Sequence, residues 1–402
     1  MLKHNGRFLH LSLLLVIWLI TALAVPCSGL VSGMEESTAE EIDIEESIEF
    51  VPSPGTPQLI NFDIFEDIAK AKALLGQKVC GFHVVQSKKQ KKAGKGKKKR
   101  TVTLLGKKEL GEFTILLAVL NVKTRSIEIV KVHPKLGGKS ANVTVEPGKP
   151  NGVNTRFRIV YPEHHVVLAL KRPVRQGDGF AEVVYTPYSE DLDIPAVREA
   201  GLEYLRNLVV AARNDLIGRG VRPRWSEDFI REDVALTLAL IEHIDPMKFE
   251  SGRYTTEKLI HETLVIMGAN TQCAYQYATS RAGARGLFQF IPGTYRKISY
   301  LYPRAELKKD FVQAMEDHHN AAKASFLLFD ADLRILKGNV TDNSYEIGKA
   351  LASAYNCGSG KTKAAMDRYG EIWPMRVPAE TQIYLKKFEA VWKWLHPAPQ
   401  AP

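Results

Sequence analysis

Cysteine is scarce in this sequence, with four residues in a chain of 402. Domains that depend on disulfides for stability carry cysteine at a much higher density, so a disulfide scaffold is excluded. Cys80, Cys273 and Cys357 lie beyond the N-terminal segment. Cys273 and Cys357 each lie close to one of the motifs described below, and the sequence allows a bridge between them.

Histidine spacings typical of a metal site are also missing. The candidates are His243, His261, His318 and His319, and their separations match no ligand motif. We therefore expect no metal and no cofactor.

Positive charge is concentrated in one place. The formal net charge is +10, but residues 88–100 alone contain nine lysines and arginines, so the rest of the chain is close to neutral. A general nucleic-acid-binding surface is therefore excluded. The run itself is expected to be a solvated hairpin loop, with contact to an anionic envelope polymer as the alternative.

The one long apolar run spans residues 9–25 and follows a short basic start. This layout predicts a secretory signal over 1–24, with the small residues Ala22 and Ala24 at the cleavage site. An uncleaved membrane anchor is the alternative, and Pro26 argues against a lipid-modified Cys27. Residues 25–57 are acidic and proline-rich and read as a linker. The mature chain is expected in the periplasm or cell envelope.

Between the linker and residue 189 the sequence predicts a β-rich accessory domain, over 58–189, that begins with a short amphipathic helix at 62–75. Segments rich in Val, Ile, Thr and Phe alternate with Gly, Pro and Asn turns at 79–85, 101–105, 113–122, 126–132, 155–161, 166–171 and 181–185. No catalytic constellation is evident in this region.

From residue 190 the apolar residues recur with helical spacing. Helices are expected from 194, over 234–241, and at 256–267, 314–336, 344–354 and 380–395. The predicted fold class is α+β with two domains, in which a β-rich N-terminal domain is followed by an all-α catalytic domain over 190–398.

A glycine-rich stretch at residues 278–294 reads ATSRAGARGLFQFIPGT. Gly283 and Gly286 allow the backbone to turn tightly and to pass close to a bulky neighbour. Gln289 places an amide in an apolar run, where it needs a partner from the protein or from a ligand. A tight turn between helices with a capped glutamine is the alternative without a function.

This stretch resembles the signature of the SLT family of murein lytic transglycosylases, with Phe288 in place of the usual Met. The segment ASAYNCG at 352–358 is similar to that family's second motif, and Glu380, Thr381 and Tyr384 to its third. The resemblance covers about the last 200 residues. It implies a lysozyme-like fold and cleavage of peptidoglycan glycan strands at the MurNAc–GlcNAc β-1,4 bond. It also implies 1,6-anhydro-MurNAc products made by one Glu that acts first as an acid and then as a base.

Two residues compete for the role of that Glu. Glu242 ends the apolar run 234–241 and precedes a Pro-containing turn, as the general acid does in the family. Glu262 is nearer to the signature and is followed by Thr263, but it lies within a helical run. Glu242 is therefore favoured and Glu262 is the alternative.

The resemblance also implies supporting roles for other residues. Tyr355 is expected to position the acid or the N-acetyl group, while the residues expected to line the glycan site are Ser280, Gly286, Gln289 and Asn356. Two other functions remain open. A lysozyme-type muramidase would need Asp245 or Glu250 as a second carboxylate, and a non-catalytic murein-binding protein would need no acid at all.

Overall fold

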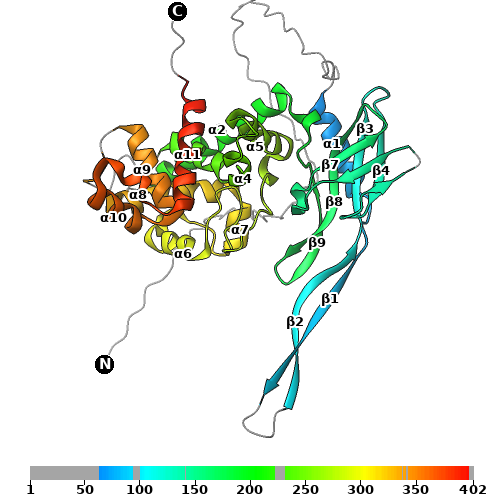
Figure 1. Ribbon diagram of the computed structural model, residues 1–402, viewed down its shortest axis with the longest axis horizontal. Helices are drawn as coiled ribbons and strands as arrows, with labels where there is room; N and C mark the ends of the chain where they lie inside the picture. Colours follow the sequence, from blue (N-terminus) through cyan, green and yellow to red (C-terminus); the bar gives the residue numbers. More distant parts are fainter. Residues whose placement is uncertain are drawn as a thin grey trace, which may run out of the picture.

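The computed structural model describes residues 63–93, 100–140, 142–221, 231–336, 338–340 and 343–397. The expected signal segment and linker, and residues 94–99 of the lysine-rich run, lie outside the described residues, so those expectations stay predictions. Strands dominate the first part of the described chain and helices the second (Figure 1).

Strands in the first part form three antiparallel units. Their order is β4-β3-β8-β9 in the largest sheet, β5-β6-β7 in a smaller sheet and β1-β2 in a two-stranded ribbon. The bounds are β1 Phe82–Ala93, β2 Arg100–Phe113, β3 Ile115–Asn121, β4 Ile127–Val132, β5 Gly138–Lys139, β6 Thr144–Pro147, β7 Phe157–Tyr161, β8 His165–Gln176 and β9 Gly179–Tyr185.

Helix α1 (Ile64–Gly76) lies against the largest sheet. Asp63 caps its N-terminus, because the carboxylate Oδ1 accepts from the backbone N–H groups of Phe65 and Glu66. Its buried face includes Ile68 and Leu75. Strand β3 is apolar at consecutive positions and almost wholly buried, as expected of a strand covered on both faces.

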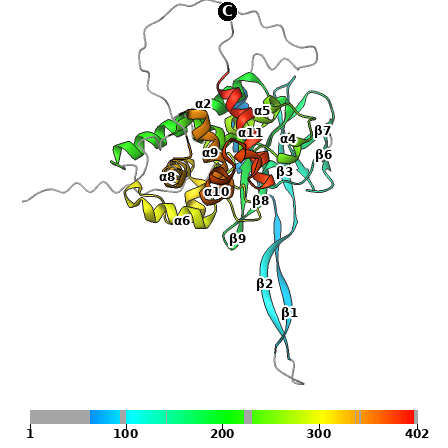
Figure 2. The same cartoon turned by 60° about the vertical axis from the view of Figure 1, so that its left-hand side comes forward.

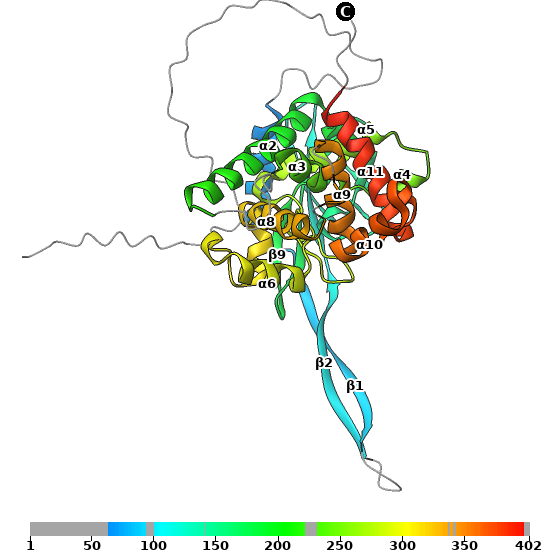
Figure 3. The ribbon, with the colours of Figure 1, turned by 90° about the vertical axis from the view of Figure 1, so that its left-hand side faces the viewer.

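The ribbon β1-β2 projects away from the rest of the molecule (Figures 2 and 3). Lys88 pairs with Leu105, and Ala93 pairs with Arg100. The expectation of a loop over the whole run 88–100 is therefore wrong. Residues 88–93 form a strand because 101–105, rich in Thr and Val, provides a partner of high β propensity.

Helices make up most of the second part. Their bounds are α2 Pro195–Gly218, α3 Glu232–Ile241, α4 Pro246–Glu250, α5 Thr256–Asn270, α6 Pro292–Leu301, α7 Phe311–Glu316, α8 His318–Leu336, α9 Ser344–Cys357, α10 Ser359–Tyr369 and α11 Ala379–Leu395. The single helix expected at 314–336 is interrupted at Asp317, whose backbone is extended and whose carboxylate accepts from the N–H of Asn320. Helices α4, α6 and α10 were not predicted.

The expected fold class, a β-rich domain followed by an all-α lysozyme-like domain, is wrong. The structure is mixed α+β, with 53% helix and with 20% strand in small sheets, and no all-α C-terminal domain is found in the described chain. Arg285 forms β-bridges with Thr279 and Phe290 among the helices, whereas α1 belongs to the strand-rich part. The buried apolar residues of both parts also form one continuous core cluster.

Specific polar contacts join the two parts. Asn270, at the end of α5, forms a pair of hydrogen bonds with the backbone of Thr186, each 2.9 Å long. Lys72 on α1 donates to the Ala269 carbonyl at 2.6 Å. The Tyr185 hydroxyl accepts from the Tyr275 N–H at 3.1 Å. Since these groups are buried or partly buried, the strand-rich part is held in one orientation over the helices.

Candidate active site

Glu242 lies where helix α3 ends. Every residue from 234 to 241 is buried, so the helix runs through the core before it reaches this glutamate. Pro246 then starts the short helix α4, capped by Asp245, which accepts from Met247 N at 2.8 Å. This change of direction leaves the Glu242 side chain at the edge of the core instead of on an exposed helix face.

The surroundings of Glu242 favour its protonated form. Burial raises its pKa from 4.5 to about 7, although the Tyr384 hydroxyl and the nearby ammonium of Lys387 act in the opposite direction. The Tyr384 hydroxyl donates to Glu242 Oε1 at 2.6 Å. The negative end of the α3 dipole also disfavours a carboxylate at this position. Glu242 therefore exchanges a proton near neutral pH.

Glu242 opens into a cleft of about 820 Å³ that lies between the two parts of the molecule. The helical part contributes Glu242, His243, Tyr275, Tyr277, Ala278, Thr279, Ser280, Arg285, Gln289 and Val312. The strand-rich part contributes Leu110, residues 151–154, residues 172–175, Gly177 and Phe180. Among these lining residues Glu242 is the only carboxylate. The strand-rich part was expected to be an accessory domain, but it forms a wall of this cleft.

The glycine-rich stretch folds into a tight turn beside the cleft. Gly286 has a φ of +75°, and a Cβ atom there would lie 2.3 Å from the carbonyl oxygen of Met315. Gln289 also has a positive φ, and its Nε2 donates to the Gly286 carbonyl at 2.7 Å. Ser280 and Gln289 line the cleft, whereas Gly286 shapes the turn without being one of the lining residues.

Tyr355 and Asn356 are not among the residues that line the cleft. The Tyr355 hydroxyl donates to the carbonyl of Phe288, so it supports the turn, although the Glu242 carboxylate is near enough to help raise the pKa of Tyr355 after burial. Asn356 Oδ1 accepts from the Thr381 hydroxyl at 2.7 Å and joins α9 to α11. The hydroxyl that reaches Glu242 belongs to Tyr384, to which sequence reasoning gave no role. The sequence did point to Tyr384, because this residue belongs to the third motif together with Glu380 and Thr381.

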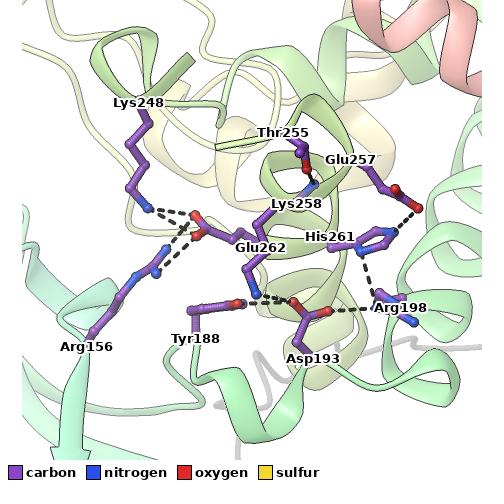
Figure 4. Close-up of polar contacts among 10 residues, drawn as sticks. All are labelled: Arg156, Tyr188, Asp193, Arg198, Lys248, Thr255, Glu257, Lys258, His261 and Glu262. Atoms are coloured by element: carbon purple, nitrogen blue, oxygen red, sulfur yellow. Dashed lines mark hydrogen bonds and ion pairs between the residues drawn. The ribbon is translucent and has the colours of Figure 1, made fainter. Parts of the chain in front are cut away.

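Glu262 is in a different environment on helix α5. Its carboxylate is 2.6 Å from Arg156 Nη2 and 2.8 Å from Lys248 Nζ (Figure 4). Burial alone would raise its pKa, but the hydrogen bonds and charges of these two cations outweigh burial and lower it. Glu262 is thus ionised at neutral pH, which makes it a poor proton donor there.

His243 follows Glu242 in the chain and also lines the cleft. Its ring stacks on Tyr275 at a centroid distance of 3.5 Å, and its Nε2 lies 2.8 Å from the Leu287 carbonyl oxygen. Burial lowers the pKa of His243 to about 3, so the ring is neutral and donates through Nε2. His243 therefore anchors the turn of the glycine-rich stretch and places no positive charge beside Glu242.

Three further findings concern the sequence expectations. Cys273 is disulfide-bonded and Cys357 is a free thiol, so the two are not bridged to each other. Within the described ranges no three His, Cys, Asp or Glu side chains gather as a metal site would require. No helix of the described chain has both the length and the apolar character needed to span a membrane.

Comparison with known proteins adds no name to this site. No family model matches the chain, and no curated protein matches it.

Proposed function

We propose that this protein is a murein lytic transglycosylase that acts outside the cytoplasmic membrane, with Glu242 as its acid and base. One observation carries the proposal: a single carboxylate with a pKa of about 7 lies in the cleft, next to the glycine-rich turn. A pKa close to the working pH makes both the protonated and the ionised form available during one turnover.

In the first step Glu242 donates its proton to the glycosidic oxygen. The C1–O bond of N-acetylmuramic acid breaks while the oxygen of the 2-acetamido group bonds to C1. In the second step ionised Glu242 removes the proton from the C6 hydroxyl, and O6 displaces the acetamido oxygen from C1. The products are a 1,6-anhydro sugar and a free 4-hydroxyl end, and Glu242 is protonated again, so no water is consumed.

The absence of a second carboxylate from the cleft lining favours this route over hydrolysis by two carboxylates. Asp245 uses its side chain to cap α4, and Glu250 is exposed at the end of that helix. Neither lines the cleft that Glu242 enters. A lysozyme-type muramidase is therefore the weaker alternative.

Product analysis by mass spectrometry tests the proposal. Purified protein is expected to release anhydromuropeptides from isolated sacculi. Glu242→Gln is expected to lose at least 10² to 10⁴ in rate, since it removes the proton that the leaving oxygen needs. Glu250→Gln, an exposed substitution nearby, serves as the matched control and should keep wild-type activity.

Each other outcome has a distinct meaning. Reducing ends in place of anhydro ends would identify a muramidase. Retention of activity in Glu242→Gln, with loss in a folded Glu262→Gln protein, would make Glu262 the acid. Binding of murein without any cleavage would leave a non-catalytic envelope protein.

A further inference from the structure

A second cavity of about 490 Å³ adjoins the cleft. The two share four lining residues, Asn151, Asn154, His243 and Tyr275, so a ligand in the cleft can extend a branch into the second cavity without leaving the protein surface. The acid Glu242 lines only the cleft. The second cavity is therefore placed to hold a part of the substrate that does not react.

The charges around this cavity have a surplus of cations. Lys149, Arg156 and Lys248 line it together with the carboxylates of Asp245 and Glu262. Arg156 has five N–H donors, and two of them bind Glu262. The side chains of Arg156 and Lys248 remain 41% and 26% exposed. A carboxylate of a ligand can approach both cations at the open side of the cavity.

Asn154 adds a specific requirement. Its side-chain oxygen Oδ1 is buried and has no hydrogen-bond partner among the described residues. A buried acceptor without a partner destabilises a protein unless a ligand or a water satisfies it. Because Asn154 lies where the cavity joins the cleft, a ligand with an N–H group near its attachment point would satisfy this oxygen.

The rest of the lining suits aliphatic groups. Ile244, Leu259 and Ile266 supply an apolar surface, and the rings of Tyr188 and Tyr254 lie under Arg156 and Lys248. An amide N–H at the entrance, short aliphatic side chains within and a carboxylate at the open side together describe a short acidic peptide. A strand without peptides keeps one carboxylate on the lactyl group of each muramic acid, but this carboxylate lies beside the sugar ring. Such a strand has no aliphatic side chains for the cavity and no carboxylate that extends to its open side.

We infer that the second cavity binds the peptide branch of a peptide-bearing glycan strand, so that this chain selects such strands over bare ones. The inference rests on the proposed function and adds the substrate class. Arg156 and Lys248 bind the carboxylate, Asn154 accepts from the first amide, and Glu262 keeps the two cations in place. The strand-rich part thereby contributes to substrate choice through Lys149, Asn154 and Arg156.

The test compares glycan strands that carry peptides with the same strands after an amidase has removed them. Wild-type protein is expected to have the higher kcat/KM on peptide-bearing strands. In Asn154→Leu the ratio of the two kcat/KM values should fall about three- to tenfold, as for the loss of one hydrogen bond. Its Tm should not fall, because Oδ1 has no protein partner to lose. Asn207→Leu, an exposed change on α2, should alter neither quantity.

The inference would be overturned if the wild type had equal kcat/KM on peptide-bearing and bare strands. It would also be overturned if the ratio of these two kcat/KM values were the same in Asn154→Leu as in the wild type. If Asn154→Leu does not fold, Lys149→Gln at the exposed rim replaces it, and its ratio should fall less at high salt than at low salt. Failure of the proposed function is a separate result, namely no anhydro ends from either substrate. In that case calorimetric titration of both strands into Glu242→Gln still decides whether the peptide branch is bound.

Discussion

Two glutamates in this molecule have pKa values shifted in opposite directions by their immediate neighbours. Glu242 is buried and receives one neutral hydroxyl, whereas Glu262 is paired with two cations. A raised pKa is typical of a carboxyl group that exchanges protons, whereas a lowered pKa is typical of a carboxylate that holds neighbouring groups in place. The residue type is the same, and only its partners assign the role.

The hydroxyl of Tyr384 is expected to set the pH at which activity declines. It donates to Glu242 and stabilises the ionised carboxylate, so Tyr384→Phe should raise the pKa of Glu242 further above 7. The alkaline limb of the kcat/KM profile should then move about 0.5 to 1 pH unit higher. A pH–rate series on a soluble glycan checks this, with Tyr300→Phe at an 85% exposed site as the control. If the alkaline limb does not move in Tyr384→Phe, a group other than Glu242 causes the decline in activity.

Substitution of the two glutamates should change stability with opposite pH dependence. The raised pKa of Glu242 means that its contribution to stability is complete below pH 4.5 and is lost as pH rises through about 7. Glu242→Gln should therefore be more stable than wild type by about 2 kcal/mol at pH 8, and close to it at pH 4.

Glu262→Gln should be less stable than wild type at pH 7, by about 1 to 2 kcal/mol, since Arg156 and Lys248 lose their common partner but remain partly exposed. The lowered pKa of Glu262 contributes stability above its unfolded pKa, and this contribution is lost as pH falls through the folded value. The difference should therefore shrink in acid. Urea unfolding at pH 4 and pH 8 measures both variants, and the same sign at pH 8 for both would contradict this assignment.

At the scale of elements, the crossing of α2 and α5 depends on two glycines. A Cβ atom at Gly201 would lie 2.1 Å from the carbonyl oxygen of Leu264, and one at Gly268 would lie 2.0 Å from that of Val197. Backbone atoms cannot move aside as a flexible side chain can, so an alanine at either position must push the helices apart.

Gly201→Ala is therefore expected to destabilise the protein by about 3 kcal/mol. Gly218 ends the same helix with no atom within 4 Å of its Cβ position, so Gly218→Ala is the matched control. That change should stabilise slightly, because alanine has the higher helix propensity. Denaturant unfolding measures both, and similar midpoints for the two variants would show that the crossing tolerates separation.

At the scale of the whole molecule, the strand-rich and helical parts share one core and the buried hydrogen bonds of Asn270. We therefore expect them to unfold in one transition. Trp373, Trp392 and Trp394, which lie in the helical part, report its unfolding by fluorescence. Hydrogen exchange of the buried strand β3 reports the largest sheet. Coincident midpoints are expected, and earlier exchange in β3 would show that the sheet opens independently.

The expected positions of the strands and of most helices agree with the structure because they depend on local patterns. Alternating and continuous apolar residues mark β3 and β8, and the apolar run 234–241 marks α3 and the glutamate at its end. The tight turn at Gly286 was also expected from composition. Lys88 to Ala93 were misread because a lysine-rich segment has no apolar pattern, and its strand is specified by the partner residues 100–105.

The sequence by itself determined where Glu242 lies, at the end of a buried helix, and which residues form the turn beside it, since both depend on neighbours in the chain. Only the tertiary structure decided which glutamate is protonated. Tyr384 is 142 residues from Glu242, and Arg156 is 106 residues from Glu262. Residues 151–154 likewise reach the wall of the cleft only through the tertiary structure, since they are distant from Glu242 in the chain. A pKa depends on the groups that surround a carboxylate in space, and the packing of distant segments determines those groups.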